Sequence, residues 1–148
     1  MDRPVLLTNG SAPAMDAATQ DALARWGTTQ VMIVGGPASV TSGVANGIPA
    51  AATVQRSAGA DRYDVAAALS TTLPASDRVY LTSGAGFADA LTTAALAGAK
   101  KAPLLLSTGT CATANTMTTQ FQRRPALVVA VGGSASQNPY AWQYPCGS

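Results

Sequence analysis

Short apolar runs alternate along this chain with longer, alanine-rich stretches. The runs cover residues 5–8, 30–34, 53–56, 78–82, 103–107 and 127–131, and each is typical of a strand buried on both faces of a parallel sheet. The stretches at 13–26, 61–72, 87–99 and 114–122 predict helices. The alternation predicts an α/β fold with three layers, a mainly parallel sheet of about six strands with helices on both faces.

An internal repeat is visible in the same pattern. Residues 4–10 (PVLLTNG) match 103–109 (PLLLSTG), and residues 31–36 (VMIVGG) match 128–133 (VVAVGG). Residues 53–101 occur once, so the chain consists of parts of two repeats, cut at both ends. We therefore expect one compact α/β domain built from the back part of one repeat (about 4–73) and the front and middle of the next (about 77–137), followed by an aromatic tail at 138–148.

The composition excludes several kinds of catalysis. Among 148 residues there is no histidine and no glutamate, and all seven acids are aspartates. Ser-His-Asp and Cys-His catalysis are therefore excluded, as are histidine ligands for zinc, copper or iron. The aspartates are scattered over predicted helices and turns, whereas a magnesium site needs them clustered. We expect no enzyme, no cofactor and no metal site.

Charge is unevenly distributed along the chain. Residues 1–89 hold five arginines and seven aspartates (net −2), whereas residues 90–148 hold Lys100, Lys101, Arg123 and Arg124 with no acid (net +4). Four cations are too few for a nucleic-acid groove. Two interpretations stay open for them, which are solubility and the binding of an anionic ligand.

The two cysteines, Cys111 and Cys146, are either a disulfide or a pair of buried thiols. A disulfide would close a loop of about 35 residues and contribute roughly 3 to 4 kcal/mol. No apolar run approaches the roughly 18 residues that a membrane span needs. The first residues lack the pattern of a signal peptide, so an exported protein would have this chain as an excised piece.

Four blocks of sequence resemble the cell wall binding repeat 2 family. They are residues 56–66 (RSAGADRYDVA), 84–91 (GAGFADAL), 102–106 (APLLL) and the two segments that end in Val-Gly-Gly. The resemblance implies a Toprim-like or Rossmann-like fold and a non-catalytic module of Gram-positive surface proteins, present in tandem copies, that binds anionic wall polymers. Within the motifs we interpret five residues as structural: Arg56, Gly59, Tyr63, Phe87 and Asp89.

This sequence departs from the family pattern at two places. Val65 replaces the usual threonine, and no second Arg-Tyr block follows Gly133. The turn at Gly84 and Gly86 lies where a phosphate-binding turn would, but Asp89 replaces the last glycine of a dinucleotide fingerprint and would repel a pyrophosphate. A nucleotide site is therefore not expected.

The ligand-binding residues are predicted from charge and from the resemblance. Lys100 and Lys101 end a predicted helix, where they either stabilise its dipole or reach an anionic polymer beside the apolar strand that the family links with binding. Arg62 either pairs with Asp89 or reaches a phosphate or uronate. The predicted binding set is Arg62, Lys100, Lys101, Leu104, Leu105, Leu106, Arg123 and Arg124.

Three aromatic residues in the tail alternate in sequence. Tyr140, Trp142 and Tyr144 would face one way in an extended strand, either packed on the core or exposed as a stacking surface for sugars.

The predicted function is a non-catalytic module that anchors a secreted protein in the bacterial cell wall. Its expected partner is an anionic wall polysaccharide or a teichoic-acid-like polymer, and its expected location is extracellular. The alternative function is a protein interaction or self-assembly domain that binds copies of itself.

Overall fold

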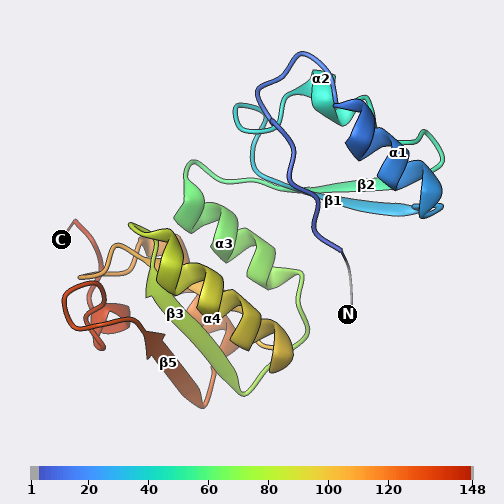
Figure 1. The fold of residues 1–148 in the computed structure, drawn as a ribbon. Helices are drawn as coiled ribbons and strands as arrows, with labels where there is room; N and C mark the ends of the chain where they lie inside the picture. The colour runs from blue at the N-terminus through green and yellow to red at the C-terminus, as the bar shows by residue number, and fades with distance from the viewer. Residues whose placement is uncertain (1–3, 148) are drawn as a thin grey trace. The chain divides into compact units, whose positions relative to one another are not determined.

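A computed structural model describes residues 4–147. The chain divides between Ala58 and Gly59 into two compact units, named unit 1 and unit 2 (Figure 1). This division falls earlier in the chain than the repeat junction expected at residues 73–77.

Unit 1 contains two parallel strands and two helices. Strand β1 (Gln30–Val34) pairs with β2 (Thr53–Ser57) from Gln30↔Thr53 to Val34↔Ser57. Helices α1 (Ala17–Arg25) and α2 (Ser42–Ala45) lie before and between them in the chain. The unit has a core of its own, in which Met15, Leu23 and Val44 are buried together.

Helix α1 begins later than the sequence pattern predicted because Asp16 caps it. The Asp16 Oδ1 accepts the Thr19 backbone N–H at 2.9 Å, and Oδ2 accepts the Thr19 hydroxyl at 2.8 Å. These hydrogen bonds, the backbone one first, lower the pKa of Asp16 below its ordinary value. The carboxylate satisfies donors that the first helical turn leaves free, so the helix starts at Ala17 rather than at Pro13.

Unit 2 contains three parallel strands in the order β4-β3-β5. The strands are β3 (Arg78–Ser83), β4 (Leu104–Ser107) and β5 (Leu127–Val131), with Tyr80 opposite both Leu104 and Val129. The helices are α3 (Arg62–Thr71), α4 (Phe87–Ala99) and α5 (Ala114–Arg123), and a short 3₁₀ helix, η1 (Ala141–Gln143), follows β5.

Helices cover both faces of this sheet. Parallel crossovers are right-handed, and the chain moves from β3 to β4 in one direction and from β4 past β3 to β5 in the other. Helices α4 and α5 therefore lie on opposite faces. On the α4 face, Tyr80 packs with Ala97 and Ala102. On the other face, a separate buried cluster is formed by Val79, Leu81 and Leu105. The predicted α/β class with parallel strands and helices is confirmed.

The predicted number of strands is wrong by one. The described residues form five strands in two sheets, and residues 5–8 adopt no regular structure. The segment that corresponds to residues 5–8 in the second repeat is β4, and β4 forms a strand by pairing with β3. Within the described chain residues 5–8 pair with no strand, and Val5 and Leu7 are 85% and 92% exposed.

The tail is bound to unit 2 by a disulfide between Cys111 and Cys146. Backbone hydrogen bonds support it, because the Ala112 N–H donates to the Tyr144 carbonyl and the Cys146 N–H donates to the Ala112 carbonyl, both at 2.9 Å. The tail turns through η1 instead of forming an extended strand. The aromatic side chains therefore do not share one face: Trp142 packs on the buried cluster, while Tyr140 and Tyr144 are exposed.

The longest helix among residues 4–147 is α4 with 13 residues. None of the described helices is long and apolar enough to cross a bilayer.

Candidate functional site

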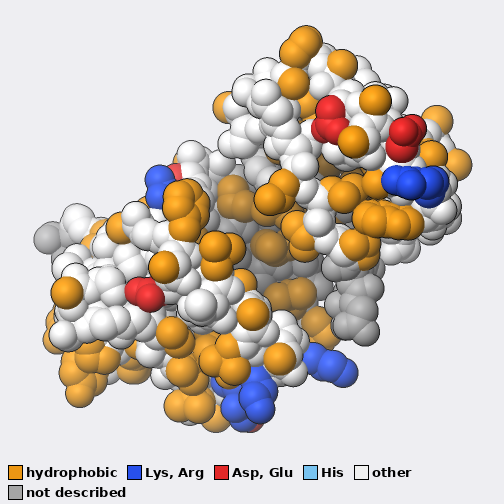
Figure 2. All heavy atoms as spheres, in the orientation of Figure 1, with side chains coloured by type: hydrophobic (Ala, Val, Ile, Leu, Met, Phe, Trp, Pro, Cys, Tyr) orange, Lys and Arg blue, Asp and Glu red, His pale blue; other side chains and the backbone are white. Residues whose placement is uncertain are grey.

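Two opposite edges of the unit 2 sheet carry different chemistry. The three strands are parallel, so their amino ends meet at one edge and their carboxyl ends at the other. Lys100 and Lys101 end α4 just before β4, and Arg124 ends α5 just before β5. All three side chains are exposed, and basic side chains gather at this end of unit 2 in Figure 2. We name these three residues the cationic edge.

The neighbouring ion pair does not reduce the charge of the cationic edge. The Arg78 Nε lies 3.0 Å from the Asp77 Oδ1, and Nη2 lies 3.1 Å from Oδ2. The hydrogen bond from Arg78 lowers the pKa of Asp77, and the same pairing raises the pKa of Arg78. Because Asp77 and Arg78 neutralise each other, the edge keeps three positive charges. Strands β4 and β5 flank β3, so the two strands that these charges precede lie about 10 Å apart.

Two residues of the cationic edge have left-handed backbones. Lys101 has φ 52° and Arg124 has φ 45°, and within the described chain they are the two residues other than glycine with positive φ. Lys101 occupies the C′ position of a Schellman motif, since its N–H donates to the Gly98 carbonyl and the Ala102 N–H donates to the Ala97 carbonyl. Glycine is the usual residue at such positions because it has no Cβ to clash.

Two of the arginines predicted to bind the ligand donate hydrogen bonds to backbone carbonyls instead. The Arg62 Nη1 donates to the Gly84 carbonyl at 2.7 Å. Arg123 donates to the carbonyls of Ser70, in the last turn of α3, and of Leu73 and Pro74, which follow the helix. Both contacts join distant segments of unit 2, so these guanidinium groups have structural partners in the absence of a ligand. A pair between Arg62 and Asp89 was one of two interpretations of Arg62; in the structure Arg62 donates to the Gly84 carbonyl and Asp89 accepts from Ser136.

The apolar strand predicted to touch the ligand lies inside unit 2. Leu105 is fully buried in the cluster that it forms with Val79 and Leu81, and Leu104 and Leu106 are half-buried. Leucine side chains at these positions stabilise the sheet by burial.

The five motif residues have diverse surroundings. The Arg56 Nη1 donates to the carbonyls of Gly35 and Val40 at 2.8 and 3.0 Å, which closes the turn after β1. A Cβ on Gly59 would lie 2.4 Å from the Asp64 Cβ, so glycine is required there. The Tyr63 ring packs against Gly84, Phe87 is 84% exposed, and Asp89 accepts a hydrogen bond from Ser136.

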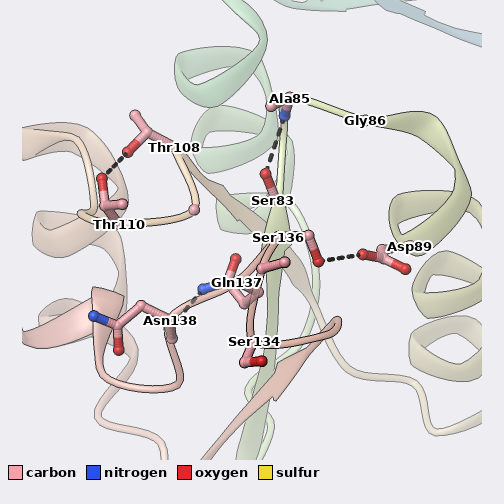
Figure 3. Close-up of a pocket in the computed structure, with 12 residues that line it drawn as sticks. Ser83, Ala85, Gly86, Asp89, Thr108, Thr110, Ser134, Ser136, Gln137 and Asn138 are labelled. Carbon is pink, nitrogen blue, oxygen red and sulfur yellow. Dashed lines mark hydrogen bonds between the residues drawn. The ribbon is translucent and has the colours of Figure 1, made fainter.

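The carboxyl edge of the sheet holds a pocket that the sequence did not predict. The loops after β3, β4 and β5 enclose an open hollow of about 420 Å³, lined by residues in 83–89, 108–110 and 134–138 (Figure 3). Ligands of open α/β sheets bind outside the carboxyl ends of the strands. We name this hollow the polar pocket. It lies one strand length from the cationic edge, which is about 17 Å for β3.

The polar pocket is rich in hydroxyl and amide groups. The Ser136 Oγ donates to the Asp89 Oδ2 at 2.9 Å, and Figure 3 shows Thr108 and Thr110 on the opposite wall. Asp89 is the one charged residue in the described lining. The sequence contained a signal for this site, since each strand is followed by small and hydroxylated residues, as in 83–86 (SGAG), 107–110 (STGT) and 133–136 (GSAS).

No metal-binding cluster is present in the described part of the chain. Groups of three or more cysteine or aspartate side chains are not brought together anywhere in residues 4–147.

Comparison with known proteins relates the chain to bacterial wall proteins. It is 30% identical over 134 residues to the N-acetylmuramoyl-L-alanine amidase LytC of Bacillus subtilis, covering 90% of this chain and 27% of that protein. It is 39% identical over 77 residues to the amidase enhancer of the same organism, covering 51% of this chain and 11% of that protein. The chain thus spans a small part of each curated relative.

Solved structures share the fold. Cwp6 from Clostridium difficile matches with a TM-score of 0.78 at 23% identity, covering 84% of this chain and 20% of that one. Cwp8 from the same organism matches with a TM-score of 0.65 at 22% identity, covering 77% and 19%. The model of the cell wall binding domain 2 family matches residues 56–139, which is more than half of the sequence and includes the motifs at Arg56, Tyr63 and Asp89. The chain belongs to the cell wall binding domain 2 (CWB2) family.

Proposed function

We propose that this chain is a non-catalytic module that anchors a secreted protein in the cell wall by binding an anionic wall polymer at the cationic edge. The observation that carries the proposal is the exposure of Lys100, Lys101 and Arg124 at one sheet edge, where Asp77, the acid just before β3, is already paired with Arg78. A phosphate or carboxylate of a polysaccharide or teichoic-acid-like chain complements this charge.

The left-handed backbone at Lys101 and Arg124 supports a binding role. Residues with a Cβ cost about 1 to 2 kcal/mol in this conformation, whereas a cation at a helix C-terminus contributes about 0.3 to 1 kcal/mol. Glycine would therefore serve both turns as well or better. The side chains at these positions contribute something other than folding stability, and ligand binding accounts for that.

Each module is expected to bind the polymer with low affinity. Exposed charge contacts contribute on the order of 1 kcal/mol or less and are screened by salt. Three such contacts give low affinity in one module, and linked modules bind firmly through avidity. LytC is named as an amidase, and this chain matches about a quarter of it. The role proposed for this chain is attachment to the wall.

The decisive experiment compares wall binding by a variant that loses the three charges of the cationic edge with a control variant that loses one exposed charge elsewhere. The test variant carries Lys100→Ala, Lys101→Gly and Arg124→Gly, because glycine suits the left-handed positions. The control carries Arg25→Ala, which removes an exposed cation from α1 in unit 1. Each protein is sedimented with Gram-positive walls, before and after hydrofluoric acid removes phosphate-linked polymers, at low and high salt.

We expect the unmodified chain and the Arg25 control to bind intact walls at low salt and to lose most binding on stripped walls or at high salt. The test variant should bind weakly under every condition while keeping its melting temperature. Equal binding of the test variant and the control would refute the role of the cationic edge, and equal binding to intact and stripped walls would refute an anionic ligand.

Self-association is the second candidate function, and α4 provides the observation in its favour. Phe87 and Leu91 are 84% and 69% exposed on this helix, and α4 buries Thr93 and Ala97 toward the sheet. Large exposed apolar side chains on one helix are typical of a contact surface. Light scattering should detect a dimer that Phe87→Ser with Leu91→Ser abolishes; a monomer at all concentrations would exclude this function.

A further inference from the structure

We propose that the polar pocket is a separate carbohydrate site, which binds an uncharged, polyhydroxylated sugar residue. The proposal does not depend on the cationic edge, because the two sites lie at opposite ends of β3 and share no residue.

Hydrogen-bonding capacity is the first argument for a sugar. Serine and threonine hydroxyls both donate and accept, and asparagine and glutamine amides offer one group of each kind. The pocket presents Thr110, Ser134, Ser136 and Asn138 on loops from two strands, and half of its remaining described lining is alanine and glycine. Such a surface matches the mixed donor and acceptor groups of neighbouring sugar hydroxyls, and its described lining contains none of the large hydrophobic or aromatic side chains typical of small-molecule sites.

Charge is the second argument, and it selects an uncharged ligand. The lining contains Asp89 and no lysine or arginine. A phosphate or uronate placed there would be repelled by the carboxylate, whereas a sugar hydroxyl would donate to it in a charge-assisted hydrogen bond. The Oδ2 atom already accepts from Ser136 at 2.9 Å, and a carboxylate can accept further donors at both oxygens.

The pocket walls are held in place before any ligand arrives. Gln137 is buried, its Oε1 accepts from the Ser107 Oγ at 2.8 Å, and its Nε2 donates to the Asn138 carbonyl at 2.9 Å. The Asn138 N–H donates to the Gly109 carbonyl at 2.6 Å, which joins the loop after β5 to the loop after β4. Preformed walls reduce the ordering cost of binding.

The test is a titration of the full chain followed by two-dimensional NMR of backbone amides. The probes are maltose, cellobiose, N,N′-diacetylchitobiose and the neutral polysaccharide from walls stripped with hydrofluoric acid, with inorganic phosphate as the anionic probe. We expect at least one neutral probe to shift amides in 83–89, 108–110 and 134–138, equally at low and high salt. Phosphate should leave those amides unchanged.

Two variants test the assignment, and the variant of the cationic edge serves as the matched control. Asp89→Asn keeps the side-chain shape but loses the charge, and it should bind the neutral probe at least about tenfold more weakly. Thr110→Val removes an exposed hydroxyl that lies 3.4 Å from the Thr108 hydroxyl, so it should weaken binding without unfolding the chain if Asp89→Asn proves unstable.

The outcomes separate this site from the proposed function. Loss of sugar binding in the pocket variants, with salt-sensitive wall binding retained, supports the carbohydrate site. The proposal is overturned if no neutral probe shifts the pocket amides, if phosphate shifts them instead, or if Asp89→Asn and Thr110→Val bind the sugar as the unmodified chain does. Failure of the cationic edge variant to lose wall binding bears on the anionic-polymer proposal alone.

Discussion

Reduction of the Cys111–Cys146 disulfide should destabilise unit 2 and leave unit 1 unchanged. The bond joins the loop after β4 to the tail, and both cysteines belong to unit 2. The tail brings Trp142 against the buried cluster formed by Val79, Leu81 and Leu105. Loss of the bond therefore frees a segment that also closes the core.

The expected magnitude follows from the length of the closed loop. A separation of 35 residues corresponds to about 4 kcal/mol in the chain-entropy model. For a unit of this size, 1 kcal/mol shifts the melting temperature by about 4 to 8 °C. Reduction should therefore lower the melting temperature of unit 2 by roughly 15 to 30 °C.

Tryptophan fluorescence can report on unit 2 alone. Trp26 is 54% exposed in unit 1, so a Trp26→Phe background leaves Trp142 as the single reporter. Thermal melts are recorded with and without dithiothreitol, and a Cys111→Ser, Cys146→Ser variant repeats the measurement without thiol chemistry. The reducing agent must have no effect on the serine variant.

A shift smaller than about 4 °C in both the reduced chain and the serine variant would refute this reasoning. It would mean that the hydrogen bonds of Ala112 and the packing of Trp142 hold the tail without the covalent link.

Three further predictions concern single residues. Arg123→Met should destabilise unit 2 by about 1 to 3 kcal/mol, because carbonyls at the C-terminal end of α3 lose their donor, while wall sedimentation should stay unchanged; weaker wall binding at equal stability would assign Arg123 to the ligand site. Gly132→Ala should cost about 1 to 3 kcal/mol in thermal melts, since φ is 141° and the new Cβ would lie 2.9 Å from the Gln137 Cβ; an unchanged melting temperature would show that the loop relaxes freely. The pKa of Asp16 lies below its ordinary value of 3.8 when folded, so its contribution is present above about pH 4 and is lost as the pH falls through the folded pKa. Asp16→Asn should therefore make the melting of unit 1 less sensitive to acid than in the unmodified chain, and identical pH profiles would contradict the linkage.

The strands of unit 2 could be predicted because each is a nearly continuous apolar run, as strands between two layers of helices are. The segment at 5–8 has the same composition, yet it forms no strand, since a strand requires a neighbour and residues 78–83 have no counterpart in unit 1. A composition pattern indicates which segments favour extended backbone. Whether such a segment pairs depends on what the rest of the unit supplies.

Site prediction from charge was incomplete for a different reason. Arg123 and Arg124 are adjacent in the sequence and were predicted to have the same role. In the structure Arg123 donates to backbone carbonyls, whereas Arg124 is exposed at a left-handed turn. The sequence of two neighbouring arginines does not indicate that difference. The polar pocket was missed because uncharged serine, threonine and glycine residues carry little information singly. They become a site when parallel strands bring three loops to one edge.

The separation of the cationic edge and the polar pocket leads to a final prediction about coupling. The sites lie about 17 Å apart along β3, beyond the 7 to 10 Å within which substitutions usually interact. With short probes, combining Thr110→Val with the cationic edge substitutions should therefore give additive losses of binding free energy, to within about 0.5 kcal/mol. On intact walls a long polymer can occupy both sites at once, so loss of one site should also weaken the apparent binding of the other through the lower effective concentration. Coupling between short probes would contradict the independence of the two edges, and additivity on intact walls would show that no single polymer bridges them.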